Sequence, residues 1–487
     1  MGKLNNLGFT QKDEERNLAE IIEIAEKNLN DAKESIRKMG DDISDLFDSI
    51  DMRDKEGLIL WNDANIRLKE MKRNMDRFEK ARRKPYFGRI KFKEEGSSKE
   101  EAYYVGRVGI TNGKANPVVI DWRAPIASVY YENNLGKCQY TVSSEGNYEI
   151  DLLRKRTYEI ENDKLKDYFD SDVVANDELL TKYLAKNKKA VLGEIIATIQ
   201  KEQNLIIRRS PKTNIIVQGC AGSGKTTVAM HRISYILYNY EEDFRPEDFY
   251  IIGSNKILLN YITSVLPELD VYGVSQMTME ELFVRLLYED WDLNYQIKPL
   301  DKNDEVNCIK GNEQWFRNLE NFCLRYENEH IPRKNIYMDK TNTLLIGENL
   351  IDTYCKDNSK MSMQNKCIML NKILLSKYEN EIQGKNISFT DAEKKEMEKR
   401  YSGYFGKDKW KGSIYDLYNE FLQEQIQKGH EVTIPDKSYD VYDLAALAYI
   451  YKRIKEIDPI REASHVVIDE AQDFGMMAYY CMHYCLR

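Results

Sequence analysis

The stretch NIIVQGCAGSGKTTVAMHRISYIL (214–237) constrains the fold more than any other part of this 487-residue chain. Gly219 is followed, after four residues, by Gly224-Lys225-Thr226. The apolar run Ile215–Val217 predicts a short buried strand before the loop, and an amphipathic helix is predicted after it. Strand, glycine-rich loop and helix in this order are the context that a phosphate-binding loop requires. The sequence therefore predicts an α/β fold.

The residue types in this loop fit the phosphates of a nucleotide. Glycines let backbone N–H groups turn inward, and the helix N-terminus adds partial positive charge. Lys225 would neutralise the β- and γ-phosphates, and the Thr226 hydroxyl would bind Mg²⁺. The predicted cofactors are therefore ATP and Mg²⁺. The residues expected to contact the nucleotide are Gly219, Cys220, Ala221, Gly222, Ser223, Gly224, Lys225, Thr226 and Thr227.

A second apolar run, Val466–Ile468, predicts a strand that ends in two acids, Asp469 and Glu470. An acid at the end of such a strand can hold Mg²⁺ through water, and the next can act as general base towards the attacking water. We therefore expect Asp469 to be a metal ligand together with Thr226. The expected catalytic residues are Lys225, Asp469 and Glu470.

The first eighty residues carry two heptad stripes, which predict an antiparallel coiled-coil hairpin of about 30 Å. The stripes are Leu18, Ile22, Ala25, Leu29, Ala32, Ile36 and Met39, and then Trp61, Ala64, Leu68, Met71, Met75 and Phe78. The expected connector, Gly40–Gly57, is acidic. It is either a solvated loop or a tip that reaches a metal or a basic channel in a partner. Its aspartates are Asp41, Asp42, Asp45, Asp48, Asp51 and Asp54.

Composition and texture divide the rest of the chain. Short aromatic and β-branched runs predict a β-rich segment after the hairpin, and a helical linker is expected from about residue 160 to 205. Charged helix-forming sequence interrupts the α/β pattern further on, as an inserted domain would. The expected parts are the arm (1–84), the β-rich segment (85–160), the first part of the nucleotide-binding domain (161–284), the helical insert (285–440) and its second part (441–487).

Charge and cysteine content limit the functional classes. The formal net charge of −9 argues against a protein that mainly coats nucleic acid. The eight cysteines form no paired ligand spacing, which favours free thiols over a zinc or disulfide framework. Neither a secretory signal nor a membrane-spanning run is present in the sequence. We therefore expect a cytoplasmic protein with no membrane partner.

The segments GCAGSGKT and VVIDEAQD resemble the UvrD-like superfamily-one helicases, whose motors pair two RecA-like domains. The resemblance implies that this chain contains the first RecA-like domain. It implies that Gln203 reads adenine, that residues 251–262 lie where relatives contact single-stranded DNA, and that Thr278 falls near the next such contact. Thr227 departs from the pattern, because the family usually has Arg there, and these helicases do not begin with a coiled-coil hairpin.

In both departures the chain resembles one branch of these proteins, the HelD-type factors that bind bacterial RNA polymerase. Its N-terminal signatures are similar to YFGRIKF (86–92), YYVGRVGI (103–110) and VIDWRAPIASVYYE (119–132). The resemblance implies that the arm enters the secondary channel of the polymerase, where its aspartates approach the catalytic Mg²⁺ or mimic nucleic acid. It implies that the insert enters the DNA cleft, and that ATP is used to release nucleic acid and recycle the polymerase. Arg123 is expected to anchor the β-rich segment to the motor.

Two alternatives stay open at this point. One is a UvrD-like DNA helicase that translocates on single strands, and the other is a non-catalytic fragment that binds polymerase. The sequence after Asp473 is too short for a second RecA-like domain. On this basis the chain is expected to be the nucleotide-binding portion of a larger motor, an ATP hydrolase that is weak or inactive alone.

Overall fold

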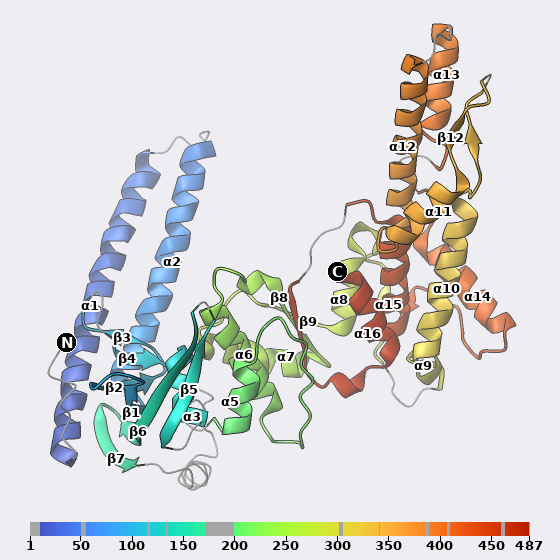
Figure 1. Ribbon diagram of the computed structural model, residues 1–487. Coiled ribbons are helices and arrows are strands. Elements are labelled where there is room, and N and C mark those ends of the chain that lie inside the picture. The colour runs from blue at the N-terminus through green and yellow to red at the C-terminus, as the bar shows by residue number, and fades with distance from the viewer. Residues whose placement is uncertain are drawn as a thin grey trace. The chain divides into compact units, whose positions relative to one another are not determined.

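The structure is a computed structural model that describes residues 10–49, 55–113, 117–132, 135–143, 145–170, 199–300, 305–339, 341–384, 389–406, 410–458 and 463–486 (Figure 1). These residues form a mixed helix-and-sheet fold with two long N-terminal helices, consistent with the predicted α/β class. They divide into two compact units. The first unit comprises Met1–Pro246 and Ile262–Gly273, and the second comprises Glu247–Tyr261 and Val274–Arg487.

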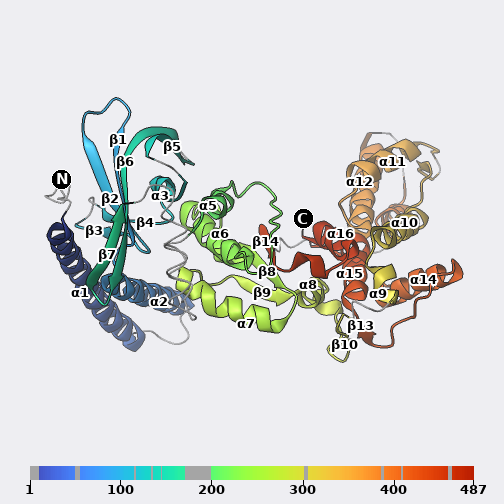
Figure 2. The same cartoon turned by 90° about the horizontal axis from the view of Figure 1, so that it is seen from below.

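Two long helices, α1 (Gln11–Ser49) and α2 (Lys55–Arg83), lie side by side in the first unit (Figures 1 and 2). At 1.5 Å per residue, the 39 residues of α1 extend about 58 Å, well beyond the expected 30 Å. The predicted connector is wrong in its first part, because α1 continues past Gly40 to Ser49. Apolar contact with α2 extends that far: the Phe47 and Trp61 ring centroids are 5.5 Å apart.

The N-terminal half of α1 packs on a β-sheet. Leu18, Ile21 and Ala25 are buried in one cluster with residues of the sheet, such as Tyr104 and Val119. Glu14 is fully buried beside them, and its carboxylate accepts hydrogen bonds from Arg156, Arg89 and Tyr104. Of the α1 residues beyond Leu29, Ile43 is the one that is buried. The arm is therefore fixed at its base, and the distal half of α1 mainly contacts α2.

A seven-stranded sheet forms the body of the first unit. The strand order is β3-β4-β2-β1-β6-β5, and β7 also pairs with β6. Strands β2 and β4 are parallel, whereas the other pairs are antiparallel. The strands are β1 (Gly88–Glu94), β2 (Glu100–Gly106), β3 (Ile110–Thr111), β4 (Pro117–Asp121), β5 (Gly136–Val142), β6 (Gly146–Glu161) and β7 (Lys164–Asp170).

The helical linker expected from residue 160 begins with strand β7 instead, so that part of the prediction is wrong. Asn162 and Asp163 form the turn between β6 and β7 with φ values of 47° and 63°. This left-handed pair is the backbone of a tight hairpin, and Asn and Asp adopt it at low cost. Leu165 and Tyr168 of β7 pack against the cluster under α1, which holds the strand on the sheet. Residues 171–198 of the expected linker lie outside the described residues.

Several helices follow this sheet along the chain. Helix α5 (Lys201–Arg208) packs on α6 (Lys225–Asn239), which follows the glycine-rich loop. The other helices of this part of the chain are η2 (Pro125–Ala127), α3 (Ser128–Glu132), η4 (Pro246–Asp248), α7 (Lys256–Val265) and η5 (Leu266–Leu269).

The prediction of a strand at Ile215–Val217 is wrong for this structure, in which the segment has no regular secondary structure. Ile216 is 98% exposed. A strand is stable only when a neighbour satisfies its backbone groups, and no described strand of the first unit pairs with this segment. The β-branched pattern therefore identified a strand-forming sequence but not a strand in this unit.

The second unit contains a three-stranded parallel sheet in the order β14-β8-β9. Its strands are β8 (Phe249–Gly253), β9 (Ser275–Thr278) and β14 (His465–Ile468). The predicted strand before Asp469 is thus confirmed as β14, paired with β8 from His465↔Phe249 to Ile468↔Ile252. Strand β8 is buried along its whole length, as an inner strand of a parallel sheet should be.

Helices build most of the second unit around one apolar core. Helix α15 is buried at every residue, and helices α8 and α16 pack against it, as Figure 2 shows. The helices are α8 (Met279–Leu286), η6 (Tyr288–Asp290), α9 (Glu305–Lys310), α10 (Glu313–His330), α11 (Glu348–Asp357), α12 (Met363–Gly384), α13 (Asp391–Tyr401), α14 (Ile414–Gln427), α15 (Val441–Ile450), the π-helix η7 (Tyr451–Lys455), η8 (Ala471–Asp473) and α16 (Met476–Cys485).

Four two- or three-residue strands lie among these helices and form two small pairs, β10 with β13 and β11 with β12. Their bounds are β10 (Gln296–Ile297), β11 (Ile336–Tyr337), β12 (Leu344–Ile346) and β13 (Ser438–Tyr439). In the described part of the chain, no helix combines the length and the apolar character that crossing a bilayer would need.

Candidate nucleotide and partner sites

The glycine-rich loop adopts a backbone that requires glycine. Gly222 and Gly224 have φ values of 78° and 84°, in the left-handed region that side chains disfavour. A Cβ added at Gly219 would lie 2.8 Å from the Ser223 hydroxyl oxygen, so that side chain would have to rotate away. The loop is solvent-exposed along most of its length. Its shape therefore leaves the backbone open to a ligand, which is what a phosphate cradle requires.

Lys225 begins helix α6, and its side chain folds back over the loop. The Nζ atom donates to the carbonyl oxygens of Gly219 at 3.0 Å and Cys220 at 3.2 Å. Helix α6 is 15 residues long, so its N-terminus carries the usual partial positive charge. The ammonium group and the helix N-terminus thus act on the same place, and both favour an anion there.

Gln203 on α5 is brought next to this loop. Its side-chain amide donates to the Ser223 carbonyl at 3.3 Å, and its side-chain oxygen accepts from the Gln200 N–H at 3.1 Å. Two segments twenty residues apart therefore meet at the loop. This location is compatible with the expected contact with adenine, which itself stays a prediction.

Two arginines that sequence reasoning missed hold α5 in place. Arg232 of α6 donates to the carbonyls of Ile206, Ile207 and Arg209, and a second nitrogen donates to Ser210. Ile206 and Ile207 belong to the last turn of α5 and Arg209 is its C-cap, a place where the helix itself leaves carbonyl groups incompletely bonded. Arg208 donates to the carbonyls of residues 122–124. No local sequence pattern marks either arginine, because their partners are backbone groups of distant segments.

The segment DWRA also anchors the first unit's sheet to α6, as expected for Arg123. The buried guanidinium forms a two-pronged pair with Asp121, with Nε 2.8 Å and Nη2 2.7 Å from the two carboxylate oxygens. Its Nη1 donates to Ser234 on α6 at 3.2 Å. Trp122 packs edge-on against His231, with ring centroids 5.4 Å apart. Arg123 therefore links the strand that carries Asp121 to the helix that starts at Lys225.

His231 is a buried histidine of α6 that stays neutral over a wide pH range. Burial lowers the pKa of its imidazole to about 4, and a hydrogen bond with the Thr227 carbonyl at 2.7 Å opposes this shift only in part. Its second ring nitrogen has no hydrogen-bond partner among the described residues. A charged imidazole would be unfavourable here, so His231 serves packing rather than proton transfer.

The predicted acids follow strand β14 in the second unit. Asp469 is 7% exposed, and its backbone N–H donates to the Ile252 carbonyl at 3.0 Å, which extends the pairing with β8. Glu470 is exposed and has a φ of 53°. A non-glycine residue in this conformation is uncommon, and the examples that do occur are concentrated at functional sites. The Gln472 side chain donates a hydrogen bond to the Glu470 carboxylate.

The structure thus places the predicted site residues in both units. Gln203, the loop residues 219–224 and Lys225, Thr226 and Thr227 belong to the first unit, and Asp469 and Glu470 belong to the second. Within the first unit Gln203 is next to the loop. Joint action of the loop with the two acids stays a prediction.

The segment after Glu470 is held by close packing. Gly475 caps α16, and a Cβ there would lie 2.3 Å from the Gly311 carbonyl oxygen. The Gly475 N–H donates to the Tyr442 hydroxyl at 3.0 Å, and the Met477 N–H donates to the Gly311 carbonyl at 3.1 Å. The chain after the predicted general base is therefore fixed against α9 and α15.

A buried charge cluster lies at the start of α15. Lys310 of α9 pairs with Asp440 at 3.0 Å and Asp443 at 2.6 Å, and the Tyr418 hydroxyl donates to Asp443 at 2.5 Å. Burial raises the pKa of the Asp443 carboxyl to about 6, with a further contribution from Asp440 and opposition from Lys310. The lysine therefore compensates two acids that α15 uses at its N-terminus.

The acidic residues predicted at the tip of the arm lie on the last turns of α1. Asp41, Asp42, Asp45 and Asp48 are all exposed, whereas Asp51 and Asp54 lie outside the described residues. Asp41 forms a solvent-exposed pair with Arg37 at 3.4 Å. Exposed apolar side chains accompany them, namely Phe47, Ile59 and Leu60. The distal arm therefore presents both charge and apolar surface.

Thr278 has a structural role in this chain. Its hydroxyl accepts a hydrogen bond from the Glu281 N–H, and the Glu281 carboxylate accepts one from the Thr278 N–H at 2.9 Å. This reciprocal pair is a capping box that starts helix α8. Only 9% of Thr278 is exposed, so its side chain offers little surface to a ligand. Its expected position near a DNA contact stays a prediction.

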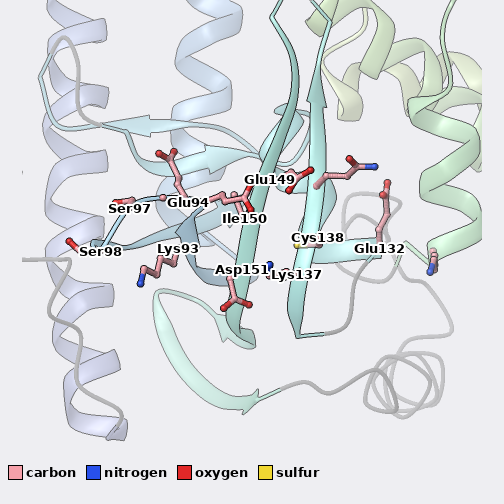
Figure 3. A pocket seen from close by; sticks show the side chains of 14 residues that line it. Lys93, Glu94, Ser97, Ser98, Glu132, Lys137, Cys138, Glu149, Ile150 and Asp151 are labelled. Carbon is pink, nitrogen blue, oxygen red and sulfur yellow. The ribbon is translucent and has the colours of Figure 1, made fainter.

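A groove of 950 Å³ lies beside the first unit's sheet, and none of the sequence-predicted site residues is among those that line it (Figure 3). Lys93, Asp151 and Lys137 stand opposite one another on β1, β6 and β5 and form a row of alternating charge. Burial raises the pKa of the Cys138 thiol in this groove, so it is less reactive than a free thiol. No group of described His, Cys, Asp and Glu residues is arranged to hold a metal ion.

The N-terminal part of the chain is similar to a known family. Residues 11–183 match the family model described as "DNA helicase IV HelD, N-terminal domain". The matched range contains both arm helices and all seven strands of the first unit's sheet. No curated protein matches the chain. The family match relates the N-terminal part to helicase-type factors and supports the HelD-type resemblance.

Proposed function

We propose that this chain is the ATP-binding motor portion of a HelD-type factor that binds bacterial RNA polymerase and uses ATP to release nucleic acid and recycle the enzyme. The observation that carries this proposal is the match of residues 11–183 to the HelD N-terminal domain. The glycine-rich loop, which lies outside that match, supplies the nucleotide part. The arm supplies the part directed at a partner.

In the proposed nucleotide site, the loop and the start of α6 bind the phosphates. The backbone N–H groups of residues 219–224 and the Lys225 ammonium oppose the phosphate charge, and Gln203 contacts the base. Thr226 and Asp469 would hold Mg²⁺, which neutralises developing charge on the phosphates. Glu470 would accept a proton from the attacking water. The left-handed backbone and the exposure of Glu470 support that role.

In the proposed partner site, the distal arm enters the secondary channel of the polymerase and the helical insert enters the DNA cleft. The exposed aspartates at 41, 42, 45 and 48 support the first contact, because they can approach the catalytic Mg²⁺ or replace nucleic acid against basic walls. The net charge of −9 is also suited to a protein that acts on a polymerase rather than on DNA.

Nucleotide binding tests the motor half of the proposal. Lys225→Ala removes an ammonium group that would form charge-assisted hydrogen bonds with phosphate, so a fluorescent ATP analogue with Mg²⁺ should bind about tenfold or more weakly. Lys212→Ala, which removes an exposed lysine shortly before the loop, is the matched control and should bind as the parent does. Equal affinity of the Lys225 variant and the parent would contradict the assignment of the loop.

A UvrD-like DNA helicase is the second candidate, and the words "DNA helicase" in the description of the matched family favour it. A translocating helicase should bind single-stranded DNA more tightly than it binds polymerase and should separate strands. A polymerase factor should bind polymerase first, with DNA affecting it only within that complex. Titration of the chain with fluorescent single-stranded DNA and with core polymerase distinguishes the two. Strand separation by the chain without polymerase would favour the helicase.

A further inference from the structure

One face of helix α2 contacts the segment that connects β8 to β9. Three side chains at positions 73, 77 and 80 follow the i, i+4, i+7 spacing and therefore lie in one row on the helix. They meet positions 272, 270 and 268 in matching order. The pairs are Arg73 with the Tyr272 ring (4.4 Å to its centroid), Arg77 Nε with Asp270 Oδ2 (3.1 Å) and Lys80 Nζ with Glu268 Oε1 (3.5 Å). We call these three pairs the α2–η5 contact.

Asp270 is the residue of this contact that reaches further into the unit. The same carboxylate oxygen that pairs with Arg77 also accepts from Arg123 Nη2 at 3.4 Å. Asp270 ends η5 with a φ of 60°, a conformation in which aspartate is among the few tolerated residues. Its side chain is 12% exposed, so water screens the two pairs only in part. Asp270 therefore joins the arm helix to the buried arginine of the DWRA segment.

Arg123 carries the connection on to the helix that follows the phosphate-binding loop. Arg123 donates to the Ser234 hydroxyl, and that hydroxyl donates to the Leu269 carbonyl at 2.8 Å. Ser234 lies nine residues after Lys225 on α6, which is about 14 Å along the helix axis. A continuous set of polar contacts thus runs from α2 through Asp270 and Arg123 to α6. Every residue in it belongs to the first unit.

The two ends of this set differ in how easily they rearrange. The Arg123–Asp121 pair is buried at both partners, with 4% and 2% of the side chains exposed. The pairs on the α2 side are more open: Arg77 is 27% exposed and Lys80 is 50% exposed. Exposed ion pairs contribute little net free energy and re-form readily, whereas a buried pair resists separation. The α2 side is therefore the adjustable side, and the α6 side is fixed.

We propose that Asp270 is a positioning residue that couples the arm to the phosphate-binding loop, so that nucleotide on the loop changes how firmly α2 is held. The proposal deepens the proposed function and rests on nucleotide binding at the loop. Coupling between sites is reciprocal, so a partner that holds the arm would change nucleotide affinity by the same factor. Asp270 is suited to this role because it contacts the fixed and the adjustable sides through one carboxylate oxygen.

Amide hydrogen exchange on the full chain, with and without a non-hydrolysable ATP analogue and Mg²⁺, tests the proposal. In the parent, the analogue should slow exchange at the loop and also change exchange in α2 by about fivefold or more, the lower end of typical couplings. Asp270→Asn keeps the shape but removes the charge. It should keep the protection of the loop and lose the response of α2.

Two further variants keep the test decisive. Arg77→Gln removes the adjustable pair but leaves Asp270 with Arg123, and it should also lose the α2 response. This variant takes the place of Asp270→Asn if the latter does not fold. Glu79→Gln is the control, since Glu79 is exposed and pairs with Arg83 of the same helix at 3.7 Å, and it should respond as the parent does. An α2 response that survives in Asp270→Asn, or that is missing in the parent despite loop protection, overturns the coupling. Loss of loop protection in the parent overturns the proposed function itself.

Discussion

At the scale of single residues, the side chains around the helix after the glycine-rich loop show how burial decides chemistry. His231 has the right chemical group for proton transfer, yet Trp122 covers one side of its ring and the Thr227 carbonyl takes one nitrogen. Burial lowers the pKa of His231 to about 4, so the imidazole is uncharged at neutral pH. The stability of the first unit should therefore depend on acid through this residue.

His231 predicts a specific acid dependence of unfolding. Below pH 6.5 the unfolded chain binds a proton at this histidine, whereas the folded chain does so only near pH 4. The free energy of unfolding should thus fall as the pH drops from 6.5 to 4, by roughly 3 kcal/mol from this group. Urea unfolding of His231→Gln should show a shallower loss over this range than the parent.

The matched control for this prediction is His330→Gln, which changes an exposed histidine of the second unit. Its urea unfolding should follow the parent's pH dependence. If His231→Gln and the parent lose stability in parallel between pH 6.5 and 4, the imidazole is not kept neutral by burial.

Sequence reasoning succeeded at this scale where a residue's role depends on its immediate neighbours. The motif predicted a glycine-dependent loop, and Gly222 and Gly224 do adopt the left-handed conformation that other residues disfavour, because the loop's shape is set locally. Arg232 could not be predicted, since it caps carbonyls of a helix more than twenty residues earlier. The capping box at Thr278 was missed, although Glu281 three residues later marks it; the expected position of Thr278 near a DNA contact stays a prediction.

At the scale of elements, the second unit depends on how α9 and α15 meet. The N-terminus of α15 carries Asp440 as its cap and Asp443 one turn later, and both carboxylates are buried. Acids favour a helix N-terminus, but two buried charges need a counter-charge. Lys310 of α9 supplies it. This pairing also lies next to Gly311, which packs against Gly475 after the predicted general base.

Lys310→Met should destabilise the second unit strongly. The variant leaves two buried carboxylates without their ammonium partner, which typically costs about 3–5 kcal/mol. The loss should be greater at pH 8 than at pH 5, because the Asp443 carboxyl, whose pKa burial raises to about 6, can bind a proton at the lower pH and so remove part of the uncompensated charge. Thermal unfolding at the two pH values measures both effects.

Lys428→Met is the control, because Lys428 is 53% exposed and pairs with Glu424 at the surface. It should change the free energy of unfolding by no more than about 0.5 kcal/mol. A Lys310 variant as stable as this control at pH 8 would show that the cluster contributes nothing net.

Elements were predictable where their partners are near in the sequence or strongly patterned. Strand β14 was predicted from its β-branched run, and β8 pairs with it as a buried neighbour. The same pattern failed at Ile215–Val217, since none of the strands described in the first unit pairs there. Strand β7 was missed because the Asn162-Asp163 turn was not recognised, and α1 was predicted too short because Gly40 was taken as its end.

At the scale of the whole molecule, the chain passes between the two compact units at Pro246, Tyr261 and Gly273. The crossing at Tyr261 brings Ile262–Gly273 into the first unit, and α2 and Arg123 contact this segment. The proposed factor needs two separable parts, an arm that binds a partner and a loop that binds nucleotide. The N-terminal half of α1 is buried against the sheet, and its distal half is largely exposed. The distal arm and the loop can therefore be mutated separately.

The structure defines how the arm can be shortened without damage to the sheet. Deleting the whole hairpin would remove Leu18, Ile21 and Ala25, which belong to the core. Replacing residues 34–70 with a short glycine-serine linker keeps that core and the α2–η5 contact. A full-length control in which Asp41, Asp42, Asp45 and Asp48 are changed to Asn separates the contribution of charge from that of length.

Binding of purified bacterial core RNA polymerase to the parent and to the variant lacking residues 34–70 tests the central claim most directly. The parent should bind, and the shortened chain should bind at least about tenfold more weakly, a change of about 1.4 kcal/mol or more. Its affinity for a fluorescent ATP analogue with Mg²⁺ should stay that of the parent, because the loop and Gln203 are unchanged. Polymerase binding of equal strength by the shortened chain and the parent would contradict the account.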